Sequence, residues 1–171
     1  MLKPFLMAML IGFCSPVFAQ ETQEEVFETI DALRVQWDTE AVNLETYEGL
    51  ESYCRNRAYR DNTILLLNQI HHYDSSLYKI VTMKYAVDQD PEARATIDDI
   101  ETLEVDYTTK SFMIFLREEC MTFNDVERNK NMEGYEAYRK ELEAELIKYV
   151  TSITKQIDII DEHAHHLTIK P

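Results

Sequence analysis

Histidines fall into two groups along the 171-residue chain, and the group near the C-terminus is the first candidate for chemistry. It comprises Glu162, His163, His165 and His166. On a helix, His163 and His166 share a face at i, i+3, and Glu162 with His165 forms a Glu-x-x-His motif. A di-iron centre in a helical bundle requires two such motifs and two further glutamates, and this sequence contains only one motif. These four residues are therefore a candidate site for a divalent metal ion, with adventitious metal affinity as the alternative.

Haem is the other cofactor that the residue types allow. Methionine and histidine on facing helices can ligate haem iron, and Met113 with His71 is a pair of this kind. The chain has no Cys-x-x-Cys-His motif for covalent attachment. Its first helical stretch also contains neither methionine nor histidine after Gln20. We therefore expect no cofactor, and keep a divalent metal and haem as alternatives.

Catalysis needs a nucleophile with a base, a paired-carboxylate cleft or a closed metal site. Acidic residues are abundant, 32 against 17 basic ones, but no motif pairs them for acid–base work. The acidic run at residues 98–101 lacks the alternating ligands and the turn glycine of a calcium loop. The sequence therefore indicates no catalytic residue and predicts a protein that is not an enzyme, with an enzyme whose site forms only in the folded chain as the alternative.

The N-terminal segment, residues 1–19, has the features of a secretory signal peptide. It carries one positive charge, an apolar run at residues 5–13 and a small residue, Ala19, at the expected cleavage position before Gln20. A membrane anchor is the alternative, but the apolar run is shorter than the roughly 20 residues that a spanning helix needs. We expect cleavage, a mature domain of residues 20–171 without a stable membrane anchor, and a bacterial periplasmic or secreted location.

Two cysteines, Cys54 and Cys120, remain after this cleavage, because Cys14 lies in the leader. An even number of cysteines in an exported protein raises the prospect of a disulfide. In an antiparallel helical hairpin that turns near residue 89, position 54 lies across from about position 124, roughly one helical turn from Cys120. We therefore predict a Cys54–Cys120 bond. Two buried free thiols are the alternative, and no Cys-x-x-Cys motif indicates a redox pair.

Arginines and tyrosines gather around the first of these cysteines and form a candidate binding surface. Tyrosine supplies a large contact area at low entropic cost, and arginine recognises anionic groups. The residues of this surface are Tyr47, Tyr53, Arg55, Arg57, Tyr59 and Arg60. Ion pairs with Glu118 and Glu119, which the disulfide would bring close, are the alternative role of the arginines.

Helices are the elements that must position these residues. The chain has only three glycines, which leaves few places for tight β turns. Gly49, Pro91 and Gly134 divide the mature chain at three points, and apolar residues recur every three or four positions between them. Residues 61–63 (Asp-Asn-Thr) offer a further helix cap. The expected helical stretches are residues 21–48, 50–87, 92–128 and 135–164.

These stretches predict an all-α protein with a single domain. The simplest packing is an antiparallel up-down four-helix bundle with long helices, with an extra short helix near residues 50–60 if the second stretch is split. An extended helical coiled coil is the alternative, since the apolar stripes are long and the surface is heavily charged. The apolar stripe of the first stretch is Val26, Ile30, Leu33, Trp37, Ala41 and Leu44, and that of the third is Ile97, Ile100, Leu103, Tyr107, Ile114 and Met121.

The charge of the chain narrows the choice of partner. A formal net charge of −15 disfavours nucleic acid and repels an anionic membrane surface. The acidic first stretch is suited to a solvated face or to docking a basic protein. We therefore expect a non-enzymatic helical interaction protein that acts as an accessory subunit, adaptor or inhibitor of a protein partner, or as a homo-oligomer. A small-ligand- or metal-binding bundle is the alternative.

Overall fold

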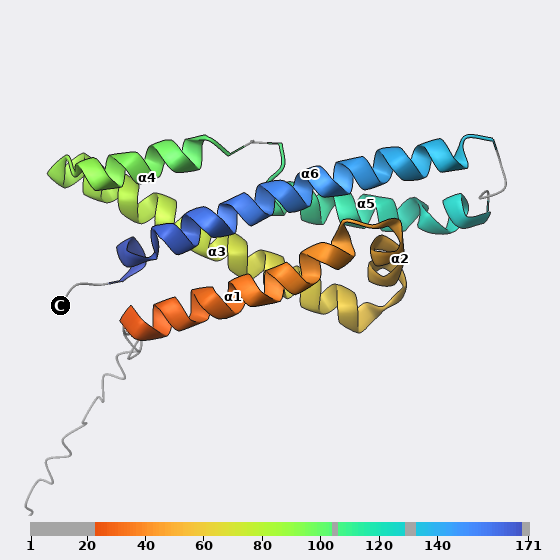
Figure 1. The fold of residues 1–171 in the computed structure, drawn as a ribbon, viewed down its shortest axis with the longest axis horizontal. Coiled ribbons are helices and arrows are strands. Elements are labelled where there is room, and N and C mark those ends of the chain that lie inside the picture. Colours follow the sequence, from red (N-terminus) through yellow and green to blue (C-terminus); the bar gives the residue numbers. More distant parts are fainter. Residues whose placement is uncertain (1–22, 104–105, 129–132, 169–171) are drawn as a thin grey trace, which may run out of the picture.

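The structure, a computed structural model, describes residues 23–103, 106–128 and 133–168, and all the regular secondary structure in these ranges is helical (Figure 1). The all-α prediction is therefore confirmed. The expected signal peptide at residues 1–19 lies outside the described residues. The elements are α1 (Gln23–Leu44), α2 (Tyr47–Arg55), α3 (Arg57–Asp88), α4 (Pro91–Glu101), α5 (Thr109–Arg128), α6 (Tyr135–Glu162) and a 3-10 helix, η1 (Ala164–Leu167).

The extra short helix expected near residues 50–60 is present as α2. The long helix α3 begins after Asn56 and not at residues 61–63, because Asn56 adopts an extended conformation and its side chain accepts a hydrogen bond from the Tyr59 backbone N–H. Thr46 caps α2 in the same way, accepting from the backbone N–H of Gly49. Gly49 therefore lies inside α2 and does not end a helix. A Cβ at Gly49 would clash with the backbone carbonyl of Asn43, so glycine lets α2 fold back tightly on the end of α1.

The prediction of a single long helix over residues 92–128 is wrong, because this stretch forms two helices, α4 and α5. Thr108 and Ser111 start the new helix by capping each other, since the Thr108 N–H donates to Ser111 Oγ (2.8 Å) and the Ser111 N–H donates to Thr108 Oγ1 (3.2 Å). The apolar stripe predicted for this stretch therefore spans two helices. An up-down bundle of four long helices is accordingly not confirmed.

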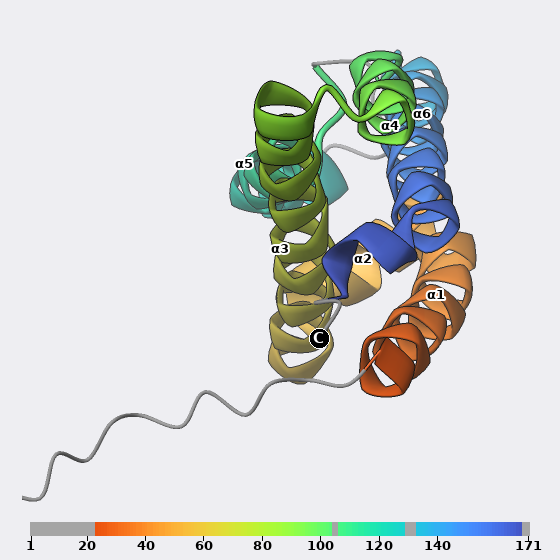
Figure 2. The ribbon, with the colours of Figure 1, turned by 90° about the vertical axis from the view of Figure 1, so that its left-hand side faces the viewer.

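The core lies between α3 on one side and α1 with α6 on the other, as Figure 2 shows. All six residues of the stripe predicted for α1 are buried. Trp37 lies at the centre of this stripe, and its indole Nε1 donates a hydrogen bond to Thr154 Oγ1 of α6 at 2.8 Å. Outside the core, Arg34 joins α1 to α6 through ion pairs with Asp158 (2.6 Å) and Asp161 (2.5 Å).

Candidate functional site

The predicted disulfide is confirmed and joins two helices at the edge of a groove. Cys54, near the end of α2, is bonded to Cys120 of α5, with their Cα atoms 5.1 Å apart. The bond places the last turn of α2 beside the middle of α5. This arrangement closes one end of the space between α5 and the first part of α3.

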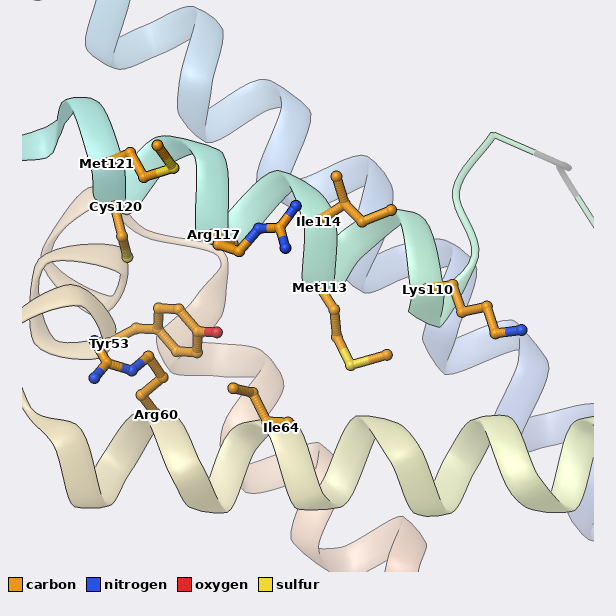
Figure 3. Close-up of a pocket in the computed structure, with 9 residues that line it drawn as sticks. All are labelled: Tyr53, Arg60, Ile64, Lys110, Met113, Ile114, Arg117, Cys120 and Met121. Carbon is orange, nitrogen blue, oxygen red and sulfur yellow. The ribbon is translucent and has the colours of Figure 1, made fainter.

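That space is a groove of about 670 Å³ between α2, α3 and α5 (Figure 3). Most of its surface is apolar, and three cationic side chains, Arg60, Lys110 and Arg117, lie among the apolar groups. None of the residues that line it is acidic. The lining residues are Tyr53, Arg60, Ile64, Lys110, Met113, Ile114, Arg117, Cys120 and Met121.

One face of α5 supplies most of this lining, because Lys110, Met113, Ile114, Arg117 and Met121 recur at helical spacing. Another face of the helix packs into the core through buried Phe112, Leu116 and Phe123. The apolar stripe predicted from the sequence for residues 92–128 includes Ile114 and Met121 as core residues. This prediction is wrong, because Ile114 is 50% exposed and Met121 is 78% exposed. The helix α5 therefore has a second apolar face that the rest of the described chain leaves uncovered.

The arginines of the groove differ from the other arginines in their partners. Arg60 donates a hydrogen bond to the backbone carbonyl of Cys54 (3.3 Å), and neither it nor Arg117 is ion-paired with any carboxylate in the described part of the chain. All the other arginines whose side chains the structure describes form ion pairs, namely Arg34, Arg55, Arg57, Arg94 and Arg139. An unpaired guanidinium next to an apolar surface is a ready partner for an anionic group.

The groove includes only part of the arginine and tyrosine surface predicted from the sequence. Tyr53 and Arg60 line it. Arg55 and Arg57 instead form ion pairs within their own helices, with Glu51 (3.1 Å) and Asp61 (3.5 Å). Glu119, one of the two glutamates considered as partners of these arginines, accepts a hydrogen bond from the Tyr138 hydroxyl (2.8 Å).

The two remaining tyrosines of that surface are held in the interior. Tyr47 is buried, and the Arg139 guanidinium lies 4.7 Å from its ring centroid. Tyr59 is half-buried, and its burial together with the Glu40 carboxylate raises the pKa of its hydroxyl. Both residues therefore contribute to packing between helices more than to an open surface.

A second cluster forms where η1 follows α6. His163, the first of its histidines, is bound to α4: its Nε2 lies 2.9 Å from Asp99 Oδ2, and its Nδ1 lies 3.1 Å from Thr96 Oγ1. His165 Nε2 lies 2.9 Å from Glu92 Oε1 of the first turn of α4. Glu162 is exposed and takes no part in the cluster. The acidic residues beside these histidines are therefore Asp99 at His163 and Glu92 at His165, both on α4, and the predicted Glu162 is not brought to them.

His166 is the most deeply placed histidine of this cluster. It is 3% exposed, and its Nδ1 lies 3.1 Å from Lys84 Nζ of α3. Burial, with the neighbouring positive charges of His165 and Lys84, lowers the pKa of His166 to about 4. The imidazole is therefore neutral at pH 7.

The histidine and methionine weighed for haem lie on α3 and α5. Met113 is half-buried and lines the groove. His71 has its Nε2 3.4 Å from Ser75 Oγ, and burial followed by the charge of Lys110 lowers the pKa of its ring. Haem at these residues stays an alternative drawn from the sequence.

Asp74, a half-buried carboxylate on α3, gives a prediction of pH dependence. Burial raises the pKa of its carboxyl. Above that raised pKa the carboxylate is charged in the folded protein, and its burial lowers the free energy of unfolding. Below the pKa of the unfolded chain the carboxyl is neutral in both states, and this loss of stability disappears. Asp74→Asn should therefore raise the free energy of unfolding by about 1 kcal/mol at pH 7, and this gain should shrink as the pH falls toward about 4. Urea unfolding at both pH values measures it.

The control for Asp74 is Asp31→Asn, which changes an exposed aspartate on α1. It should shift the free energy of unfolding by less than about 0.5 kcal/mol at either pH. A loss of stability in Asp74→Asn at pH 7 would contradict the prediction, because it would mean that the carboxylate makes a favourable interaction there.

Two places on the molecule thus gather groups that could bind a ligand: the groove beside the disulfide, and the histidine cluster at η1. Among the helices described here, none has both the length and the apolar character that crossing a membrane requires. Comparison of the chain with protein-family models, with curated proteins and with solved structures finds no match.

Proposed function

We propose that this protein is an exported, non-enzymatic binding protein, and that its groove takes an apolar molecule with an anionic head group, of the long-chain carboxylate class. One observation carries this proposal: Arg60 and Arg117, the arginines without a carboxylate partner in the described chain, both line an apolar groove. In a chain of net charge −15, a groove lined by three cations and no acid favours an anionic ligand.

The size and chemistry of the groove suit such a ligand. Its volume of about 670 Å³ is in the range of small-molecule sites, which run from about 300 to 1,000 Å³. Its length along α5, from Lys110 to Met121, is about 16 Å at 1.5 Å per residue. Met113 and Met121 are unbranched and adaptable, so they can pack around a flexible chain. The planar guanidinium of Arg117 or Arg60 can then bind a carboxylate with two hydrogen bonds.

The disulfide supports the same role. It holds α2 against α5 at Cys120, which is itself part of the groove wall. Tyr53, one residue before Cys54, lies at the same end and presents an aromatic side chain to the groove (Figure 3). A wall fixed by a covalent bond loses less conformational entropy when a ligand binds.

Calorimetric titration with palmitate, below the concentration at which it forms micelles, tests the proposal. We expect one palmitate per chain, and weaker binding of the corresponding long-chain alcohol, which lacks the charge. Arg60→Glu and Arg117→Glu should each weaken palmitate binding by about tenfold or more, since a hydrogen bond to a charged group contributes about 1.5–3 kcal/mol.

Arg57→Glu is the matched control for this titration. It makes the same charge change on the same helix as Arg60→Glu, but Arg57 is exposed and does not line the groove. Its palmitate affinity should stay within about threefold of the wild type, because an exposed charge contributes little. Absence of saturable binding, or an equal loss in Arg57→Glu and Arg60→Glu, would contradict the proposal.

Docking of a basic protein is the second candidate function, and the exposed face of α1 favours it. Asp31, Val35, Asp38 and Val42 follow one another at helical spacing, and the two valines are 66% and 69% exposed. Exposed valines that alternate with acidic residues fit a partner surface that is apolar and basic.

Native mass spectrometry of the protein from its own host, without reductant, distinguishes the two candidate functions. A small bound mass supports the groove ligand, and a co-purifying protein that Val35→Asp releases supports docking.

A further inference from the structure

The histidine cluster at η1 lies apart from the groove, at the opposite end of α3. Figure 2 views the molecule from that end and shows η1 between α3 and α1. The cluster joins η1 to two helices that precede it by more than 60 residues in the sequence: His165 and His166 belong to η1, Glu92 to the first turn of α4, and Lys84 to the last part of α3. Nothing in the groove proposal depends on these residues.

Three potential metal ligands converge there. Ligand atoms of Glu92, His165 and His166 all lie within 4.8 Å of one another. His165 Nε2 is already 2.9 Å from Glu92 Oε1, and the two imidazole rings have centroids 4.2 Å apart. Tetrahedral ligands around Zn²⁺ lie about 3.4 Å from one another, so no pair of ligand atoms in this set is more than about 1.4 Å beyond that separation.

The Nε2 nitrogens of His165 and His166 are buried and, in the described chain, lack hydrogen-bond partners. The contact of His165 with Glu92 is close but does not have hydrogen-bond geometry. A buried polar atom without a partner destabilises the fold, so its presence calls for an explanation.

We propose that Glu92, His165 and His166 bind one divalent transition-metal ion of the zinc class. Two imidazole nitrogens and one carboxylate oxygen are the ligand types that Zn²⁺ prefers among nitrogen and oxygen donors. The bound ion satisfies both unpartnered nitrogens at once. Glu92, the carboxylate of the set, is exposed to solvent.

Neighbouring residues would hold the ligands in place. His163, bonded to Asp99 and Thr96, anchors the start of η1 to α4 and so keeps His165 close to Glu92. Coordination through His166 Nε2 requires that Nδ1 carry the proton, so the Lys84 ammonium cannot donate to Nδ1 in the bound state. Lys84 is only partly buried, and its side chain can turn to solvent.

Zinc titration of the full chain, after treatment with a chelator and its removal, tests this site. We expect one Zn²⁺ per chain and an increase in Tm on binding, because a ligand that binds only the folded state stabilises it. Glu92→Gln and His165→Gln should each weaken Zn²⁺ binding by more than about tenfold. Circular dichroism without metal verifies that both variants fold, and Glu92→Gln changes an exposed residue that the core does not need.

Glu162→Gln is the matched control, because it makes the same change at the exposed glutamate beside His163 that is not part of the cluster. It should bind Zn²⁺ within about threefold of the wild type, as expected for an exposed group outside the site. Equal losses in Glu162→Gln and Glu92→Gln, an unchanged affinity in Glu92→Gln, or weak binding without saturation at one ion per chain would each overturn the proposal.

Discussion

Breaking the Cys54–Cys120 bond is expected to lower the free energy of unfolding by about 4 kcal/mol. The bond closes a loop with a sequence separation of 66 residues, and a cross-link of that span removes much of the conformational freedom of the unfolded chain. The bond acts on the short, nine-residue helix α2. Beside it, the last turn of α2 also contacts α5 through the Arg55 guanidinium, which lies 5.5 Å from the centroid of the Phe123 ring.

Urea unfolding of the wild type, with and without a reductant, measures this effect, and a Cys54→Ser, Cys120→Ser double variant supplies the control. The double variant should match the reduced wild type and should not respond to the reductant. Palmitate binding should also weaken in the reduced protein, whereas Zn²⁺ binding should not change, because the disulfide borders the groove only. A loss of less than about 1 kcal/mol would show that the unfolded chain gains little freedom on reduction.

Trp37→Ala is expected to lower the free energy of unfolding by about 4 kcal/mol. Trp37 is completely buried, and its ring lies in the contact between α1 and α6. Removing it leaves a cavity at the centre of that contact and leaves Thr154 without its donor. The ion pairs of Arg34 cannot compensate, because they are substantially exposed and such pairs contribute about 0–1 kcal/mol.

Urea unfolding followed by circular dichroism measures the Trp37→Ala effect, since this variant has no tryptophan fluorescence. Two variants separate its causes. Trp37→Phe keeps an aromatic ring but lacks the N–H group, and Thr154→Val keeps the ring and removes the acceptor, at a cost of about 1–3 kcal/mol. If Trp37→Ala costs no more than Thr154→Val, the hydrogen bond and not the packing dominates at this position.

The helical character of the chain could be predicted because it follows from a short-range rule. The α1 stripe recurs every three or four residues, and each of its members is buried as the period requires. The spacing predicts the Cys54–Cys120 pair across a hairpin of two continuous helices that turns before Pro91. The pairing is confirmed, but that hairpin is not: its arms are divided into α2 with α3 and α4 with α5, and the bond joins the short helix α2 to α5.

The division of residues 91–128 was missed although its signal is local. Thr108 and Ser111 have the types and spacing for mutual capping, whereas the apolar stripe of this stretch continues past them and predicts a single helix. The error had a functional consequence. It assigned Ile114 and Met121 to the core, whereas the separate helix α5 turns them toward the groove.

The sequence by itself determined that the chain is helical, because the recurrence of apolar residues acts along one helix, and it indicated the Cys54–Cys120 pair through the spacing of the chain. Only the tertiary structure decided which arginines lack a carboxylate partner and which carboxylate lies beside His165 and His166. Arg55 and Arg60 look alike in the sequence, but only Arg60 faces the groove. Glu92 joins His165 and His166 because α4 and η1 pack together, and the packing of distant helices depends on the whole core and not on any local pattern.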